Sequence, residues 1–435
     1  MNRYWTGQYD SAFGDVRNWE DTPGGGSPAS SVPGASDTAH FVAGDVDCVL
    51  VADVTLGGLE TASGYAGDLD LAGYNLSGSS GADFTLAHAG DFKLGSGTLR
   101  LDGGALDWTA MLGAVDRGAS TVWVTGSAML SGRPGDRLGN LLVGGLASGS
   151  TTLAIGPGTL AVEDLTLAAS GTAEVALDTA THAAHIVVYG DLTFDLADSA
   201  TIAVDQTGAA ANWHIHGDVV SLDTSTGGVA WQRGLGTIMA TGDLAQQWDW
   251  SCVEDRLEAI VIDKGWGTLQ LLGSIECDGW THRGGVFDPN GQDITCGGDF
   301  TIEPTAPWLS EADALDGCSI SVGGDLTLAG QIGCRLRLRA TAAWSLTVTG
   351  TTEVRYVEVS SCDATGGTIV AADDGTCVDA GDNLNWRFAD TTALCFGAVA
   401  AAAVRSLGAT AGGIRVTGGL GNVFTPGSCA GAIHD

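Results

Sequence analysis

Apolar and polar residues alternate with a period of two along much of the chain. Two clear examples are residues 185–196 (HIVVYGDLTFDL) and 319–328 (SISVGGDLTL), in which every second position is mostly apolar. Such alternation predicts short strands that bury one face. Helical periodicity is absent from these segments, so we expect a mostly β protein.

The dipeptide Gly-Asp precedes many of these apolar runs and recurs at similar intervals. It begins at residues 67, 90, 190, 217, 242, 298 and 324. The intervals within its clusters are 23, 27, 25, 56 and 26 residues, and because 56 is twice 28 we expect one unlabelled repeat between residues 242 and 298. A period near 26 residues holds three short strands and their turns, which predicts a parallel β-helix rather than propeller blades of ~40–45 residues.

Each residue of the dipeptide has an expected role at a corner of the coil. Gly accepts the positive φ of a tight turn, and the Asp side chain can accept a hydrogen bond from an N–H of a neighbouring turn. About 13 turns, stacked ~4.8 Å apart, predict an elongated rod of ~60 Å.

Three regions lie outside the repeat, which we place at residues 45–390. Residues 1–44 are rich in Trp and Gly, and we expect them to form a cap or attachment segment over the open first coil. Residues 103–160 have irregular spacing and are predicted to contain insertions. Residues 391–435 are rich in Ala and Gly, and we expect a docking or oligomerisation segment there.

Composition narrows the classes of partner. The 435 residues include 52 acidic and 18 basic side chains, for a net charge of -34, which argues against binding to nucleic acid or to anionic membranes. A hydrophobic content of 44% with 13 Trp argues against disorder. The longest helix-compatible apolar stretch, Ala393 to Val404, is too short to span a bilayer, so we expect no membrane insertion.

Two terminal segments resemble those of many β-helical bacterial surface proteins and phage virion proteins. The N-terminal match comprises Arg3 to Gly7, Asn18-Trp19, Pro33-Gly34 and Asp37 to Ala39. The C-terminal match comprises Val354 to Val359, Ser361 to Ala364, Gly366-Gly367 and Gly381 to Phe388. Together they cover about 80 residues and are architectural rather than catalytic.

The resemblance implies a structural virion protein of a tailed bacteriophage, a head or tail fibre or spike that contacts host surface glycans. It further implies other virion proteins as partners and a homo-oligomer, for which a trimer is the usual state of such fibres. The first 30 residues lack the basic start and apolar run of an export signal, which favours the virion over a bacterial cell-surface adhesin. A polysaccharide depolymerase, either a glycosidase or a lyase, is the enzymatic alternative.

Aromatic residues provide the candidate glycan-binding site. Sugar rings stack on Trp, and Trp248, Trp250, Trp266 and Trp280 lie close together in the sequence, interleaved with Asp and Gly. Trp248 and Trp250 are two residues apart and so share one strand face. The alternative is that these side chains pack in the core.

Neither a catalytic site nor a cofactor is expected. A depolymerase would need paired carboxylates, and the candidates are Glu254 with Asp255, Asp373 with Asp374, and Asp288 with Asp293. With 52 acidic residues such pairs arise by chance, and no catalytic motif accompanies them. We therefore predict a protein that is not an enzyme.

Weaker candidates remain for metal binding and for disulfides. His214 and His216 lie on one face of a predicted strand and could hold a metal ion, although ordinary strand positions explain them as well. The 10 Cys include no Cys-x-x-Cys pair, so buried thiols are expected. Cys252 and Cys277 are almost one repeat apart and are predicted to stack, and Cys395 and Cys429 are the candidates for a bond in the C-terminal segment.

Overall fold

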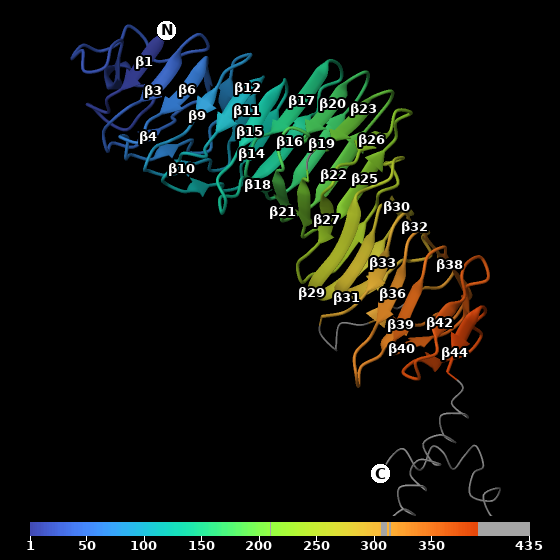
Figure 1. Ribbon diagram of the computed structural model, residues 1–435. Helices are drawn as coiled ribbons and strands as arrows, with labels where there is room; N and C mark the ends of the chain where they lie inside the picture. Colours follow the sequence, from blue (N-terminus) through green and yellow to red (C-terminus); the bar gives the residue numbers. More distant parts are fainter. Residues whose placement is uncertain (209, 306–310, 313–314, 390–435) are drawn as a thin grey trace, which may run out of the picture.

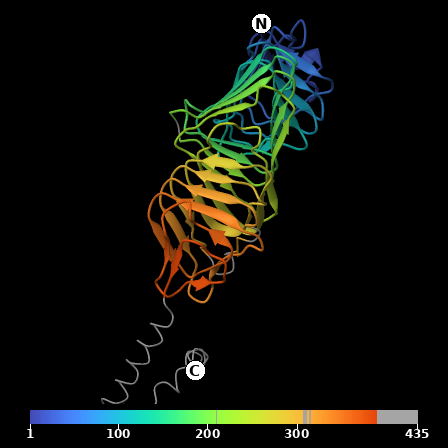
Figure 2. The same ribbon diagram turned by 90° about the vertical axis from the view of Figure 1, so that its right-hand side faces the viewer.

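The computed structural model describes residues 1–208, 210–305, 311–312 and 315–389, and it forms a parallel β-solenoid of about 14 turns. Figure 1 shows the turns stacked from β1 at the N-terminal end to β44 at the other end of the rod. The rod is elongated in the perpendicular view as well (Figure 2). The expected fold class is therefore confirmed, while the C-terminal segment predicted at 391–435, with Cys395 and Cys429, lies outside the described residues.

Two sheets form walls of the N-terminal part of the rod. Sheet A is the 11-stranded sheet, in the order β2 (Trp19–Glu20), β1 (Asn2–Trp5), β3 (Thr38–Phe41), β6 (Gly58–Thr61), β9 (Phe84–Thr85), β12 (Gly104–Asp107), β15 (Ala128–Ser131), β17 (Ser150–Ile155), β20 (Glu174–Asp178), β23 (Thr201–Asp205) and β26 (Val229–Gln232). Sheet B comprises β4 (Cys48–Val49), β7 (Leu69–Asp70), β10 (Phe92–Lys93) and β13 (Val115–Asp116).

The long sheet follows the rod over most of its length. Its strands are β5 (Val54–Leu56), β8 (Leu76–Gly78), β11 (Thr98–Leu101), β14 (Thr121–Val124), β16 (Asn140–Gly144), β18 (Thr159–Val162), β19 (Leu165–Ala169), β21 (His185–Val188), β22 (Leu192–Leu196), β24 (Asn212–Ile215), β25 (Val219–Asp223), β27 (Thr237–Ala240), β28 (Gln246–Trp248), β29 (Ala259–Leu271), β31 (Trp280–Asp288), β33 (Phe300–Ile302), β36 (Leu326–Ala329) and β39 (Thr352–Arg355). From β18 to β28 each turn contributes two strands to this sheet, and β29 and β31 run through both positions.

Smaller sheets complete the C-terminal turns. Sheet D comprises β30 (Ile275–Cys277), β32 (Ile294–Cys296), β35 (Ser319–Val322), β38 (Trp344–Val348) and β41 (Cys362–Asp363). Sheet E comprises β34 (Glu311–Ala312), β37 (Leu336–Leu338), β40 (Val357–Val359) and β43 (Val378–Asp379), and β42 (Val370–Ala372) pairs with β44 (Trp386–Phe388). Within the described ranges the single helical element is the short 3-10 helix η1 (Val16–Asn18).

The N-terminal segment is continuous with the stack that it covers. Strand β1 pairs in parallel with β3 and antiparallel with β2. Trp19 on β2 is fully buried, and its ring lies edge-on to Trp5 and Phe41, with centroid distances of 5.2 and 5.6 Å. Since β3 begins at Thr38, regular stacking starts before the predicted boundary at residue 45.

The turns differ in length more than the predicted period allows. Paired residues Val175 and Ile202 are 27 positions apart, whereas paired residues Ile260 and Trp280 are only 20 apart. The 56-residue interval between Gly-Asp dipeptides was wrongly divided, because it joins two different corners of the coil. Two turns without the dipeptide lie in it, as the pairing of β27 with β29 and of β29 with β31 shows.

Residues 103–160 form ordinary turns instead of the predicted insertions. Strand β12 is in register with β15, and β15 with β17 on the same sheet. On the long sheet β14 pairs with β16 over four residues. The irregular spacing of this region in the sequence reflects corners built from other residues than Gly-Asp.

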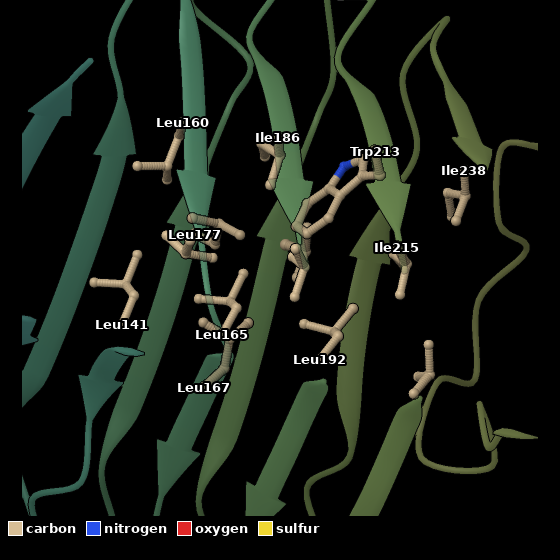
Figure 3. Close-up of a cluster of buried hydrophobic side chains, with 14 of the residues drawn as sticks. Leu141, Leu160, Leu165, Leu167, Leu177, Ile186, Leu192, Trp213, Ile215 and Ile238 are labelled. Carbon is tan, nitrogen blue, oxygen red and sulfur yellow. The ribbon is translucent and has the colours of Figure 1, made fainter. Parts of the chain in front are cut away.

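The core consists of rows of apolar side chains that run along the rod. Leu160, Ile186, Trp213 and Ile238 occupy equivalent positions on successive turns, and each is at most 1% exposed. Figure 3 shows these four side chains in the interior together with leucines of neighbouring strands. Burial of such rows supplies most of the driving force for folding, at roughly 25 cal/mol per Å² of apolar surface.

The Asp of the Gly-Asp corner has the role that the sequence predicted. The Asp164 carboxylate accepts the backbone N–H of Asp191 at 2.9 Å, and Asp191 accepts that of Asp218 at 2.8 Å, each one turn further along. The same ladder links Asp68 to Asp91 and Asp299 to Asp325, at 2.8 and 2.9 Å. Carboxylates therefore pair corner N–H groups that no strand partner reaches.

The Gly of the dipeptide has a different role from the predicted one. Of the seven corner glycines only Gly242 has a positive φ. At Gly217 an added Cβ would lie 2.2 Å from the carbonyl oxygen of Gly190, and at Gly90 it would lie 2.2 Å from that of Gly67. Glycine is required because the backbones of successive corners touch, which is a consequence of stacking and not of the local turn.

Candidate functional site

Three of the four candidate glycan-binding tryptophans are part of the core. Trp248, Trp250 and Trp280 are 0%, 2% and 1% exposed, and Trp248 packs edge-on against Trp250 with ring centroids 6.0 Å apart. Trp248 and Trp250 do share one strand face, as predicted, but that face points inward. Because a buried ring offers no face to a sugar, the prediction is wrong for these three residues.

The fourth, Trp266, lies on the surface and is 62% exposed. It sits in the middle of β29, where the register with β31 shifts at Asp263 and is regained at Thr268. Gly265 and Gly267 flank it, and Gly267 has φ +82° and lies against the backbone of Leu244 in the preceding turn. We call residues 263–267 the Trp266 bulge.

The Trp266 bulge and the preceding turn form an apolar projection from the corner. Leu244, in the adjacent corner, is 78% exposed. Directly beneath the bulge, Lys264 is only 1% exposed and donates to the amide oxygen of the buried Gln246. Burial lowers the pKa of Lys264 to about 8, against the opposing attraction of Asp243 and Asp218.

A row of amides and a carboxylate flanks the bulge on the long sheet. The Gln247 side chain donates to the Gln270 side chain at 2.9 Å, and Gln270 donates to Asp288 at 2.8 Å. These residues are in register on β28, β29 and β31. The row offers amide and carboxylate groups of the kind that bind sugar hydroxyls.

A second exposed aromatic side chain on the same side of the rod is already occupied. The Tyr189 ring lies under the Arg137 guanidinium at 3.8 Å and stacks on the His216 ring with centroids 4.9 Å apart. Glu163 forms ion pairs with Arg137 and Arg117. Since both faces of the Tyr189 ring are covered, Trp266 is the better stacking surface.

The two candidate metal ligands are not each other's ring partners. The His214 ring packs on His185 of the preceding turn, with centroids 4.5 Å apart, whereas His216 packs on Tyr189. Burial lowers the pKa of both His214 and His216, and the neighbouring imidazole of His185 adds to the effect at His214. In the described part of the chain, no group of three or more His, Cys, Asp or Glu side chains is arranged to hold a metal ion.

The candidate catalytic carboxylates have structural roles where hydrogen bonds are seen. Asp255 accepts the backbone N–H of Trp231 at 2.9 Å, and Asp293 accepts that of Ser319 at 3.0 Å. Asp373 forms an ion pair with Arg387, and Asp374 accepts the backbone N–H of Thr376. Asp288 is engaged by Gln270, as described above.

The stacked cysteine pair differs from the predicted one. Cys277 is in register with Cys296 of the next turn, and both are at most 1% exposed. On its other side Cys277 pairs with Leu257, so Cys252 does not stack on it. Cys48, Cys252, Cys318 and Cys362 are buried thiols as well.

This chain is a β-solenoid protein. No protein-family model, curated protein or solved structure matches it. Among the described residues, no helix is long and apolar enough to cross a membrane.

Proposed function

We propose that this protein is a structural component of a tailed-bacteriophage virion, a head or tail fibre or spike that projects from the particle and contacts glycans on the host surface. The observation that carries the proposal is the uninterrupted stack of about 14 turns. At ~4.8 Å per turn it extends for ~65 Å. The resemblance of its terminal segments to β-helical virion proteins supports the phage assignment.

The construction of the rod suits a projecting part. Every turn is joined to the next by ladders of backbone hydrogen bonds and by rows of buried side chains such as Leu160 and Ile186. Interiors packed in this way resist compression. The net charge of -34 keeps the rod away from DNA and from anionic surfaces.

Glycan contact is assigned to the Trp266 bulge. The exposed indole provides the apolar face on which a sugar ring stacks, and the row of Gln247, Gln270 and Asp288 provides hydrogen-bonding groups on the same corner turns. We propose binding without cleavage, since Asp288 and Asp293 are held in structural hydrogen bonds.

The proposed partners are other virion proteins and further copies of the chain, in a trimer of the kind that such fibres form. Labelling purified virions with antibodies to this protein should place it on the head or tail surface in electron micrographs. Antibody binding to the envelope of uninfected cells, with none on virions, would instead identify a bacterial cell-surface adhesin.

Glycan binding is tested with purified host polysaccharide. Trp266→Ala should reduce binding strongly, because stacking on the indole is lost. Leu235→Ala is the matched control, since Leu235 is 85% exposed on a different turn. Unchanged binding by Trp266→Ala would remove the bulge from the proposal, and release of new reducing ends by the wild-type protein would identify a depolymerase.

A further inference from the structure

One stretch of the outer face of the long sheet carries nitrogen and sulfur donors on adjacent turns. Strands β21, β24 and β27 are in register and alternate between buried and partly exposed residues. The outward positions include His185 on β21, His214 on β24 and Met239 on β27. Three successive turns therefore bring two imidazoles and a thioether to one surface.

The two imidazoles are in direct contact. The His185 and His214 ring centroids are 4.5 Å apart, and the ring planes are inclined by 40°. Nε2 of His185 is shielded from solvent and has no hydrogen-bond partner. An imidazole nitrogen in that condition is free to coordinate a metal ion.

Met239 lies on the other side of His214. The two residues are direct partners in the pairing of β24 with β27, so their side chains point the same way from neighbouring strands. Imidazole suits copper among other transition metals, and thioether sulfur selects copper in its reduced state. Carboxylates, which would favour calcium or magnesium, occupy none of these three positions.

We propose that His185, His214 and Met239 form a binding site for one copper ion on the outer face of the solenoid. The site is separate from the proposed glycan contact. It also differs from the pair that the sequence suggests, because His216 is stacked on Tyr189 and has the Arg137 guanidinium beyond that ring. Cations close to His216 would repel a metal ion, whereas Asn212 and Thr237 next to His185 and His214 are neutral.

The proposal is tested by titrating the full chain with Cu(II) and recording electron paramagnetic resonance spectra. One ion per chain should show hyperfine coupling to two imidazole nitrogens. Single variants His185→Ala and His214→Ala should each weaken binding by at least the ~10-fold that loss of even an outer-shell partner costs at metal sites. Met239→Leu should weaken binding of Cu(I), measured by competition with a chromogenic chelator.

Two matched controls separate this site from other copper ligands. His182→Ala changes a nearby histidine outside β21, and His216→Ala changes the other member of the sequence-suggested pair. Both should retain the two-nitrogen spectrum. The proposal is overturned if His185→Ala binds Cu(II) as wild type does, or if His216→Ala and not His185→Ala removes a nitrogen ligand; circular dichroism verifies that each variant is folded.

Discussion

At the scale of single residues, the position of a side chain relative to the coil decides what it can do. Trp248 and Trp266 are both flanked by polar residues in the sequence, yet one is fully buried and the other is 62% exposed. Trp248 lies on a strand and points inward, whereas Trp266 lies in a bulge flanked by glycines. The same residue type therefore stabilises the core in one place and is available for binding in the other.

Substitution of these two tryptophans should have opposite consequences. Trp248→Ala leaves a large cavity and is expected to cost about 3–5 kcal/mol of the free energy of unfolding. Trp266→Ala removes a surface side chain and should change it by no more than ~0.5 kcal/mol. Urea unfolding followed by circular dichroism measures both, and equal losses would contradict the assigned positions.

The corner carboxylates can be tested through Asp164. Asp164→Ala removes the acceptor for the N–H of Asp191 and should destabilise the protein by about 1 kcal/mol. Asp164→Asn keeps an oxygen in the same place and should preserve most of the stability. If the two variants had the same unfolding midpoint in urea, the hydrogen bond would not be the cause.

At the scale of elements, the corner determines how closely two turns approach. Gly217 and Gly190 occupy the same corner in successive turns, and neither has a positive φ. The glycines permit backbone contact between turns, while the Asp that follows each of them pairs an exposed N–H. The dipeptide thus specifies stacking at a corner, and it is absent where a turn is shorter or bulged, as at β29.

A single methyl group tests this explanation. Gly217→Ala would place a Cβ 2.2 Å from the Gly190 carbonyl oxygen and is expected to cost roughly 1–3 kcal/mol through forced separation of the two turns. Gly34→Ala is the control, because its Cβ would meet only a carboxylate oxygen of Asp37 at 3.8 Å. Thermal unfolding of both variants should show a lower midpoint for Gly217→Ala alone.

At the scale of the whole molecule, acidic groups dominate the surface and also bind the turns together. Asp68 accepts from Lys93 and from the N–H of Asp91, and these bonds lower its pKa. Backbone N–H groups of Thr351 and Ala342 lower the pKa of Asp325 and of Asp316 respectively. Each carboxylate is therefore more stable in its ionised form in the folded chain than in the unfolded chain.

This difference predicts that acid destabilises the rod. A lowered pKa in the folded state contributes stability above the unfolded Asp value of about 3.9, and the contribution is lost as the pH falls through the folded pKa. The thermal midpoint should accordingly fall between pH 5 and pH 2.5. The measurement is made in moderate salt to screen charge repulsion, and a midpoint that stayed constant over this range would contradict the role of the Asp ladder.

The sequence by itself determined the class of fold. Alternation with a period of two and the recurrence of Gly-Asp depend on local geometry, since every second side chain of a strand faces the core and every corner needs a residue that tolerates close stacking. The partners of the corner Asp could be predicted for the same reason. The resemblance of the terminal segments suggested a virion protein, and that remains a proposal.

Only the tertiary structure decided which corner, face and neighbour each residue has. The 56-residue interval was misread because turn length varies along the rod, and each change shifts the register of everything that follows. Burial of Trp280, exposure of Trp266 and contact between His185 and His214 all depend on that register. Residues one turn apart meet through stacking, and their separation in the sequence does not fix which of them meet.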